Sequence, residues 1–262
     1  MFRLIAATAL LALLPFLSWA ADEPKAVVSV DNKWIEASIV IDPALKAYPG
    51  LYDRLLADGK REYNKAVAMA AASFKDTPED FTDGRKYYFK RTDRLRSAIG
   101  PYVSVVETEA TFTGGAHPNY VVDTLLWTTQ DKRLMNIKPF FAEFAEGGPT
   151  LKLIAGHIRS ALAAEKMARG IEIVDPATDQ WLTYVEPKIR GIGGIALAPS
   201  TEKNRSSGFL VYYSPYAVGP YAEGDYVVYV PWTAFGQALS PRGAALFGGQ
   251  RPADDSKFDE RQ

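Results

Sequence analysis

The stretch Phe112-Thr113-Gly114-Gly115-Ala116-His117-Pro118-Asn119-Tyr120 lies between two runs of residues that favour β-strands. Glycine reaches backbone conformations with positive φ that are closed to other residues, whereas proline fixes φ and lacks an N–H donor. These residues together predict a specific turn that joins two strands. Because a turn that also contains histidine and asparagine can form a site, Gly114, Gly115, His117 and Asn119 are candidate ligand-binding residues.

The segments on either side of this turn have the composition of β-strands. Residues 102–113 and 120–128 are rich in β-branched and aromatic side chains. Residues 33–41 alternate between apolar and polar side chains with a period of two, as expected for a half-buried strand. Further strands are predicted at 86–92, 180–184, 192–198, 209–213 and 226–230.

Two long segments have the periodicity of amphipathic helices. Residues 50–74 place their apolar side chains on one arc, and this arc continues through Gly59, which we expect to weaken the helix. Residues 150–169 carry a second apolar stripe, with Thr150 as the expected N-cap and Gly170 as the C-terminal stop. Each helix therefore needs a sheet on which to bury its apolar side.

Strands outnumber helices, and each long helix is flanked by strands that tight turns connect. This order predicts an α+β fold with antiparallel sheets, each packed by one long helix. We expect a smaller N-terminal strand-helix-strand subdomain at 22–112 and a larger C-terminal α+β subdomain at 113–240, which ends in a short helix at 231–239. Residues 241–262 are expected to form a disordered tail, because their last part is rich in charge and poor in apolar side chains.

The first twenty residues have the features of a secretory signal peptide. Arg3 provides the positive charge, residues 4–14 form an uncharged apolar run, and Ser18-Trp19-Ala20 has the small-x-small pattern of a cleavage site. The apolar run is shorter than the roughly 18 residues that a membrane span needs, which argues against a retained anchor. We expect cleavage after Ala20 and a periplasmic or secreted product without a membrane span.

Composition excludes several kinds of chemistry. The chain has no cysteine, so disulfides, thiol nucleophiles and thiolate metal sites are excluded. Apart from Arg3 in the signal segment, 29 basic residues stand against 31 acidic ones. A net charge of about −2 offers no basic field for nucleic acid, so no nucleic-acid partner is expected.

The two histidines do not form a metal motif. His117 and His157 are forty residues apart and lack the short helical spacing of zinc ligands, so no metal and no other cofactor is expected. His117 is either a ligand contact or general base, or it hydrogen-bonds the backbone of its own turn. His157 is expected at the edge of the apolar stripe of its helix, as a hydrogen-bonded boundary residue and not as a ligand. The run Gly191-Ile192-Gly193-Gly194 lacks the other residues of a phosphate-binding loop and predicts a turn or bulge.

Aromatic side chains are concentrated near the C-terminal end. Tyr216 and Tyr221 lie in a segment rich in proline and glycine, where they either form a binding face or cover a sheet edge or the helix. Glu107 and Glu109 share one face of a predicted strand, and such pairs are usually solvated. Paired carboxylates of the kind used by glycosidases stay open as an alternative, because a sequence does not give the distance between them. No catalytic residue is assigned.

Two segments resemble the RsiV-type family of exported bacterial domains. The first, Thr113-Gly114-Gly115-Ala116-His117-Pro118-Asn119, resembles the family's Gly-Gly-Ala-His turn. The second, residues 209–224 followed by Val230-Pro231-Trp232, resembles its tyrosine-rich arm near the C-terminus. The resemblance extends over about residues 34–239 and implies a two-part α+β architecture, with an RsiV-like C-terminal subdomain.

Similar modules form the outer part of lysozyme-sensing anti-sigma factors or accompany cell-wall polysaccharide deacetylases, and much of the family has no assigned activity. This chain lacks the internal transmembrane helix of the first group and the histidine-rich metal centre of the second. The resemblance therefore implies an exported, non-catalytic binding module of the bacterial envelope that recognises a lysozyme-like protein or a cell-wall glycan such as a peptidoglycan fragment. A cofactor-free hydrolase of envelope material and a purely structural envelope protein are the alternatives. The candidate ligand-binding residues are Gly114, Gly115, His117, Asn119, Tyr216 and Tyr221.

Overall fold

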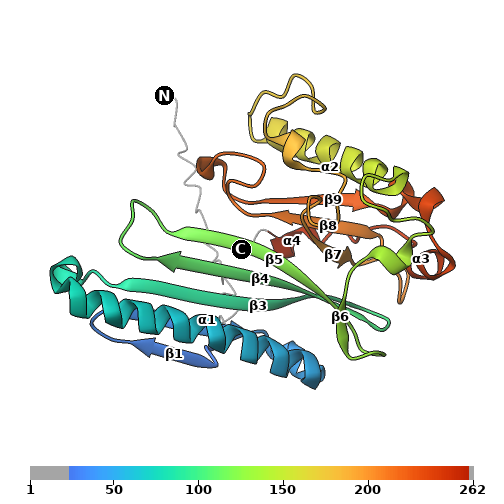
Figure 1. Cartoon of the computed structure of the whole chain (residues 1–262). Helices are drawn as coiled ribbons and strands as arrows, with labels where there is room; N and C mark the ends of the chain where they lie inside the picture. Colours follow the sequence, from blue (N-terminus) through green and yellow to red (C-terminus); the bar gives the residue numbers. More distant parts are fainter. Residues whose placement is uncertain (1–23, 260–262) are drawn as a thin grey trace, which may run out of the picture.

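The computed structural model describes residues 24–259 of the chain, so the predicted signal segment at 1–20 lies outside the described residues. Two β-sheets and two long helices make up most of this part (Figure 1). Within residues 24–259 there is no helix of the length and hydropathy needed to cross a bilayer.

The larger sheet has six strands that follow one another in the order of the sequence. β2 and β3 are parallel, whereas the other neighbouring pairs are antiparallel. The turn at 113–118 joins β4 to β5, and these two strands pair along their length. The subdomain boundary expected after residue 112 therefore lies within this sheet, between two paired strands. The strands are β1 (Val28–Asp31), β2 (Ile35–Ile41), β3 (Tyr87–Ile99), β4 (Tyr102–Phe112), β5 (Asn119–Thr128) and β6 (Arg133–Met135).

The helix α1 (Pro49–Asp76) connects β2 to β3 and covers one face of this sheet (Figure 1). A parallel pair of strands needs such a crossover, because a tight turn cannot join them. Leu51 and Leu55 are fully buried in the apolar core between helix and sheet. Gly59 is buried as well, and a Cβ at this position would lie 3.3 Å from the side chain of Ile39. The glycine thus allows the helix to approach the sheet closely.

The smaller sheet is antiparallel and consists of β7 (Gly194–Ala198), β8 (Gly208–Tyr213) and β9 (Tyr226–Pro231). The helix α2 (Pro149–Ala168) packs on its outer face (Figure 1). Every second residue of β8 and β9 points toward this helix, since the side chains of a strand alternate between its two faces. The core between helix and sheet includes Leu151, Ile154, Ile158 and Leu162 of α2 with Phe209, Val211, Tyr226, Val228 and Val230.

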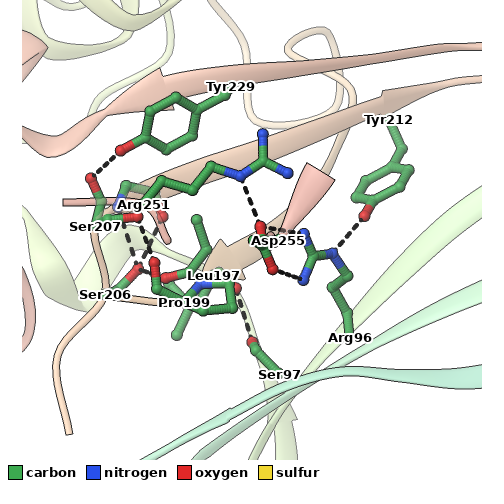
Figure 2. A network of polar contacts seen from close by, with 12 residues as sticks. Arg96, Ser97, Leu197, Pro199, Ser206, Ser207, Tyr212, Tyr229, Arg251 and Asp255 are labelled. Atoms are coloured by element: carbon green, nitrogen blue, oxygen red, sulfur yellow. Dashed lines mark hydrogen bonds and ion pairs between the residues drawn. The ribbon is translucent and has the colours of Figure 1, made fainter. Parts of the chain in front are cut away.

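The two sheets face each other, so the molecule has four layers in the order α1, six-stranded sheet, three-stranded sheet and α2 (Figure 1). An apolar cluster fills part of the contact between the sheets, with the small side chains of Ala196 and Ala198 facing Val106 and Val122. Hydrogen bonds add to this contact, because the Ser97 hydroxyl donates to the carbonyl oxygen of Leu197 at 2.7 Å (Figure 2). The predicted α+β fold, with one long helix on each sheet, is confirmed.

Several local predictions are wrong in detail. Gly148, not Thr150, is the N-cap of α2, because Pro149 takes the first helical position, where its missing N–H costs nothing. The strand predicted at 180–184 is instead a 3₁₀ helix, and the helix predicted at 231–239 consists of two 3₁₀ turns. The 3₁₀ helices are Pro43–Ala47, Pro78–Gly84, Lys138–Phe140, Leu182–Tyr184, Tyr221–Glu223, Trp232–Ala234 and Gly236–Ala238.

The segment after residue 240, for which composition predicts a disordered tail, is folded in the part that the structure describes, residues 241–259. It contains the short helices α3 (Pro241–Leu246) and α4 (Ser256–Asp259). Leu246 and Phe247 are buried in the core beneath α2, and Asp255 forms ion pairs with arginines. Composition misleads here because Asp255 of this segment is neutralised by Arg96 of the folded body.

Candidate functional site

The Gly-Gly turn at 113–118 is exposed at the end of β4 and β5. Gly114 has a φ of +90°, which L-residues with a side chain rarely adopt, so the turn requires glycine there. The imidazole of His117 is exposed, and its Nδ1 lies 2.8 Å from the carbonyl oxygen of Pro118. The ring is therefore both accessible to a ligand and oriented by its own turn.

A second segment, residues 214–225, lies next to this turn, and we call it the arm. At its start, the Ser214 hydroxyl accepts a hydrogen bond from the Val122 N–H at 2.9 Å and donates to the Val122 carbonyl at 3.2 Å. Near its end, Glu223 forms an ion pair with Lys166 of α2 and accepts a hydrogen bond from the Tyr226 hydroxyl. The arm is thus attached to β5 at one end and to α2 at the other.

The turn and the arm bring three aromatic rings together, and we call His117, Tyr216 and Tyr221 the aromatic cluster. The rings of His117 and Tyr221 are stacked, with centroids 4.0 Å apart and an angle of 25° between their planes. Tyr216 lies against Tyr221 with centroids 5.5 Å apart. The Tyr221 hydroxyl donates to the carbonyl oxygen of Pro118 at 2.7 Å, which ties the arm to the turn.

Tyr216 has an unusual backbone conformation for a large residue. Its φ is +70°, in a region that bulky side chains rarely occupy, and the residue is 54% exposed. Such a conformation costs about 1–3 kcal/mol and persists only where the surrounding structure holds it. Because this cost is associated with functional sites more often than with plain loops, the conformation marks the arm as a candidate site.

The remaining candidate residues lie near the cluster in sequence but do not join it. Gly114 and Gly115 line a separate hollow of about 280 Å³ together with Phe81 and Tyr87. Asn119 is exposed at the first position of β5, opposite Thr111. Of the six candidates, the structure therefore gathers His117, Tyr216 and Tyr221.

A larger cleft of about 580 Å³ lies beside β5, where β6 ends. Its walls include Asp123, Tyr184 and Arg190, none of which the sequence reasoning selected. The available signal was the run 191–194, because these glycines line the cleft. At Gly193, where φ is +88°, a Cβ would lie 2.8 Å from the ring of Tyr213, so the wall of the cleft leaves no room for a side chain there.

A group of buried charges lies between α1 and the six-stranded sheet. The Arg91 guanidinium is hydrogen-bonded to the Asp93 carboxylate at 3.1 Å and forms an ion pair with Glu107. Burial raises the pKa of Glu107 to about 7 and that of Asp93 to about 6, and the attraction of Arg91 offsets this only in part. Glu107 is therefore held in a structural ion pair, contrary to the expectation that it is solvated.

The remaining titratable candidates do not come together in a site. His157 is exposed on α2 and does not lie at a buried boundary. Among residues 24–259, histidine, aspartate and glutamate side chains do not gather in a group of three that could hold a metal ion.

The protein is thus an α+β protein with two stacked sheets, in which the turn at 113–118 and the arm carry the aromatic cluster. Residues 144–233 match the family described as "Protein of unknown function (DUF3298)". This match includes α2, the smaller sheet and the arm with Tyr216 and Tyr221, whereas His117 lies outside it.

Solved structures of DUF3298 family members are similar to this chain. A member from Bacteroides fragilis has a TM-score of 0.51 and 14% sequence identity, covering 83% of this chain and 93% of that one. A family protein from Pseudomonas aeruginosa has a TM-score of 0.49 and 13% identity, covering 82% and 88%. At such low identity the likeness to the first concerns the fold alone. No curated protein matches the sequence.

Proposed function

We propose that the protein is an exported, non-catalytic binding module of the bacterial envelope, and that it contacts a cell-wall glycan through the aromatic cluster. The observation that carries this proposal is the meeting of His117, Tyr216 and Tyr221 from segments about one hundred residues apart. Aromatic rings with polar edges are amphipathic, so they pack on the apolar C–H face of a sugar while their edges hydrogen-bond its hydroxyl groups.

The way the arm is held supports a binding role. Ser214 and Glu223 attach its two ends, and Tyr221 attaches its middle to the turn. The rings are thereby ordered before a ligand arrives, and a preorganised site loses less conformational entropy on binding. The resemblance to RsiV-type domains, which the DUF3298 match leaves open, agrees with a module that recognises envelope material.

A non-catalytic role also fits the disposition of the carboxylates. Glu107 has a pKa of about 7, which would suit a general acid, but its carboxylate is engaged by Arg91 between helix and sheet. A hydrolase would need that group to reach a substrate. We therefore place the cofactor-free hydrolase behind the binding module.

The test is isothermal titration calorimetry, in which soluble peptidoglycan fragments are added to the protein. Removing one stacking ring should cost about 1.4 kcal/mol, so Tyr216→Ala and Tyr221→Ala should each weaken binding about tenfold. Tyr184 is the comparison, because it is a tyrosine 60% exposed in the wall of the cleft beside β5, outside the cluster; if the glycan contacts the cluster and not the cleft, Tyr184→Ala should bind as the unmodified protein does.

Two outcomes would contradict this proposal. Equal losses in the Tyr184 control and the cluster variants would show that the site lies elsewhere. No binding of any fragment, together with binding of a lysozyme that the cluster variants lose, would identify a lysozyme-like protein as the partner in place of a glycan.

A further inference from the structure

Arg96 of β3 is a buried cation between the two sheets, and its side chain is only 1% exposed. Its Nε donates to the Tyr212 hydroxyl at 3.0 Å (Figure 2). Its two terminal nitrogens donate to the two oxygens of Asp255 at 2.8 and 2.7 Å. This two-pronged geometry is the one in which arginine recognises a carboxylate most specifically.

The C-terminal segment that contains Asp255 also places an aromatic ring against Arg94 and Arg96. The ring of Phe258 lies 4.7 Å from the guanidinium carbon of Arg94 and 4.6 Å from that of Arg96. Asp255 and Phe258 are three residues apart, a spacing that places side chains on one side of a helical turn. The arginines thus bind an acidic residue and an aromatic residue three positions later in the sequence.

We call residues 250–259 the strap. Gln250 is tied to Thr201 by two hydrogen bonds. For residues 251–259, the backbone hydrogen bonds that the described structure shows are internal, from Asp255 N–H to Pro252 and from Phe258 N–H to Asp255. Side chains therefore hold this part of the strap to the body, chiefly Asp255 through Arg96, whereas the hydrogen bond from Arg251 to Asp255 at 2.6 Å lies within the strap.

The chain before the strap is fixed to the body, because the Gly248 N–H donates to the Ser206 carbonyl at 2.9 Å and the Gly248 and Gly249 carbonyls accept from Ser200 and Trp232 at 2.7 and 3.1 Å. Gly249 has a φ of +68°, so the backbone there follows a path that few residues other than glycine adopt. If residues 251–259 moved away from the body, Arg96 would lose its two-pronged ion pair with Asp255. Because losing an ion-pair partner is costly for a buried arginine, the site favours a replacement carboxylate.

We propose that Arg94, Arg96 and Tyr212 form a peptide-binding site for segments with an aspartate followed three residues later by an aromatic residue, and that the chain's own strap occupies this site in cis. A partner protein that presents such a segment would compete with the strap. This site is separate from the aromatic cluster, so a test of the peptide-binding proposal does not depend on whether the protein binds a glycan.

The probe is a fluorescein-labelled synthetic peptide with the sequence of residues 250–262, added to the full-length protein and followed by fluorescence anisotropy. In the unmodified protein the strap competes at an effective concentration on the order of millimolar, so the peptide should bind poorly. In Asp255→Asn the strap loses its ion pairs, and the peptide should bind at least tenfold more tightly. Asp254→Asn is the matched control, since Asp254 is exposed beside it, and this variant should bind poorly.

A second experiment covers the case in which Asp255→Asn does not fold. A protease site inserted between Gly249 and Gln250 is cut after folding, so that the strap can leave the intact body. The labelled peptide should then replace the strap, whereas peptides with Asp255→Asn or Phe258→Ala should not. Retention of the strap without exchange, or equal binding of the altered peptides, would overturn the proposal.

Discussion

Lys166 provides the sharpest test of how the arm is held in place. Its side chain is 1% exposed and pairs with Glu223, whose side chain is 16% exposed. Its ammonium group also lies 4.8 Å from the centre of the Tyr226 ring. Replacement by methionine keeps the length of the side chain and removes the charge, so the change acts on the ion pair more than on packing.

The expected magnitudes follow from the unequal burial of the two partners. Removing one partner of a buried ion pair costs about 3–5 kcal/mol, because it leaves the other charge uncompensated. Lys166→Met leaves a carboxylate that still reaches solvent and the Tyr226 hydroxyl, so we expect about 3 kcal/mol. Glu223→Gln leaves an ammonium group that is almost completely buried, so we expect about 5 kcal/mol.

The assay is urea denaturation of the two single variants and the double variant. The double variant has no uncompensated charge, so it should lose at least 2 kcal/mol less than the two single losses added together. Chymotrypsin provides a second measurement, because it should cleave after Tyr216 and Tyr221 faster once the end of the arm is loosened. Losses that add within about 0.5 kcal/mol, with unchanged cleavage, would refute the reasoning.

Three further predictions concern the sheets. The pKa of Glu107 is raised to about 7, so the fold binds a proton more readily than the unfolded chain, and the free energy of unfolding should fall by about 1–3 kcal/mol as pH rises from 5 to 8. Glu107→Gln should reduce this dependence in denaturation curves recorded across that range and leave the part due to Asp93, whose pKa is raised to about 6, whereas an unchanged slope would mean that Arg91 keeps Glu107 ionised. Gly208→Ala should destabilise the protein by about 3 kcal/mol, because φ is +151° and the new Cβ would lie 2.1 Å from the Val230 carbonyl oxygen; a shift of the denaturation midpoint near zero would contradict this. The Thr128 hydroxyl is buried with no hydrogen-bond partner among the described residues, so Thr128→Val should raise stability by about 1 kcal/mol in the same measurement, and a loss would show that the hydroxyl is satisfied.

Local patterns in the sequence predict much of the fold. The apolar periods predict α1 and α2 to within about two residues, and the turn residues predict the link between β4 and β5. The parallel pairing of β2 with β3 was not predicted, because it depends on how α1 crosses the sheet and not on the residues of either strand. Short apolar runs such as 180–184 do not distinguish a strand from a 3₁₀ turn, since both bury alternate or neighbouring side chains over a few residues.

The candidate site shows the same limit at longer range. His117 and Tyr221 were selected separately for their local composition, and only the fold shows that their rings stack. Asp255 lies in a segment whose charge predicted disorder, yet it meets Arg96 from 159 residues away. Composition describes a segment in isolation, whereas the partner that neutralises a charge is chosen by tertiary structure.

The hydrogen bonds of Ser214 also bear on how the protein avoids aggregation. β6 pairs only with the last residues of β5, so residues 119–125 have one edge without a neighbouring strand in the described structure. An open edge of this kind attracts strands from other molecules. The Ser214 hydroxyl engages both the N–H and the carbonyl of Val122 in the middle of that edge. A single side chain from the arm thereby interrupts the ladder that an incoming strand would have to form.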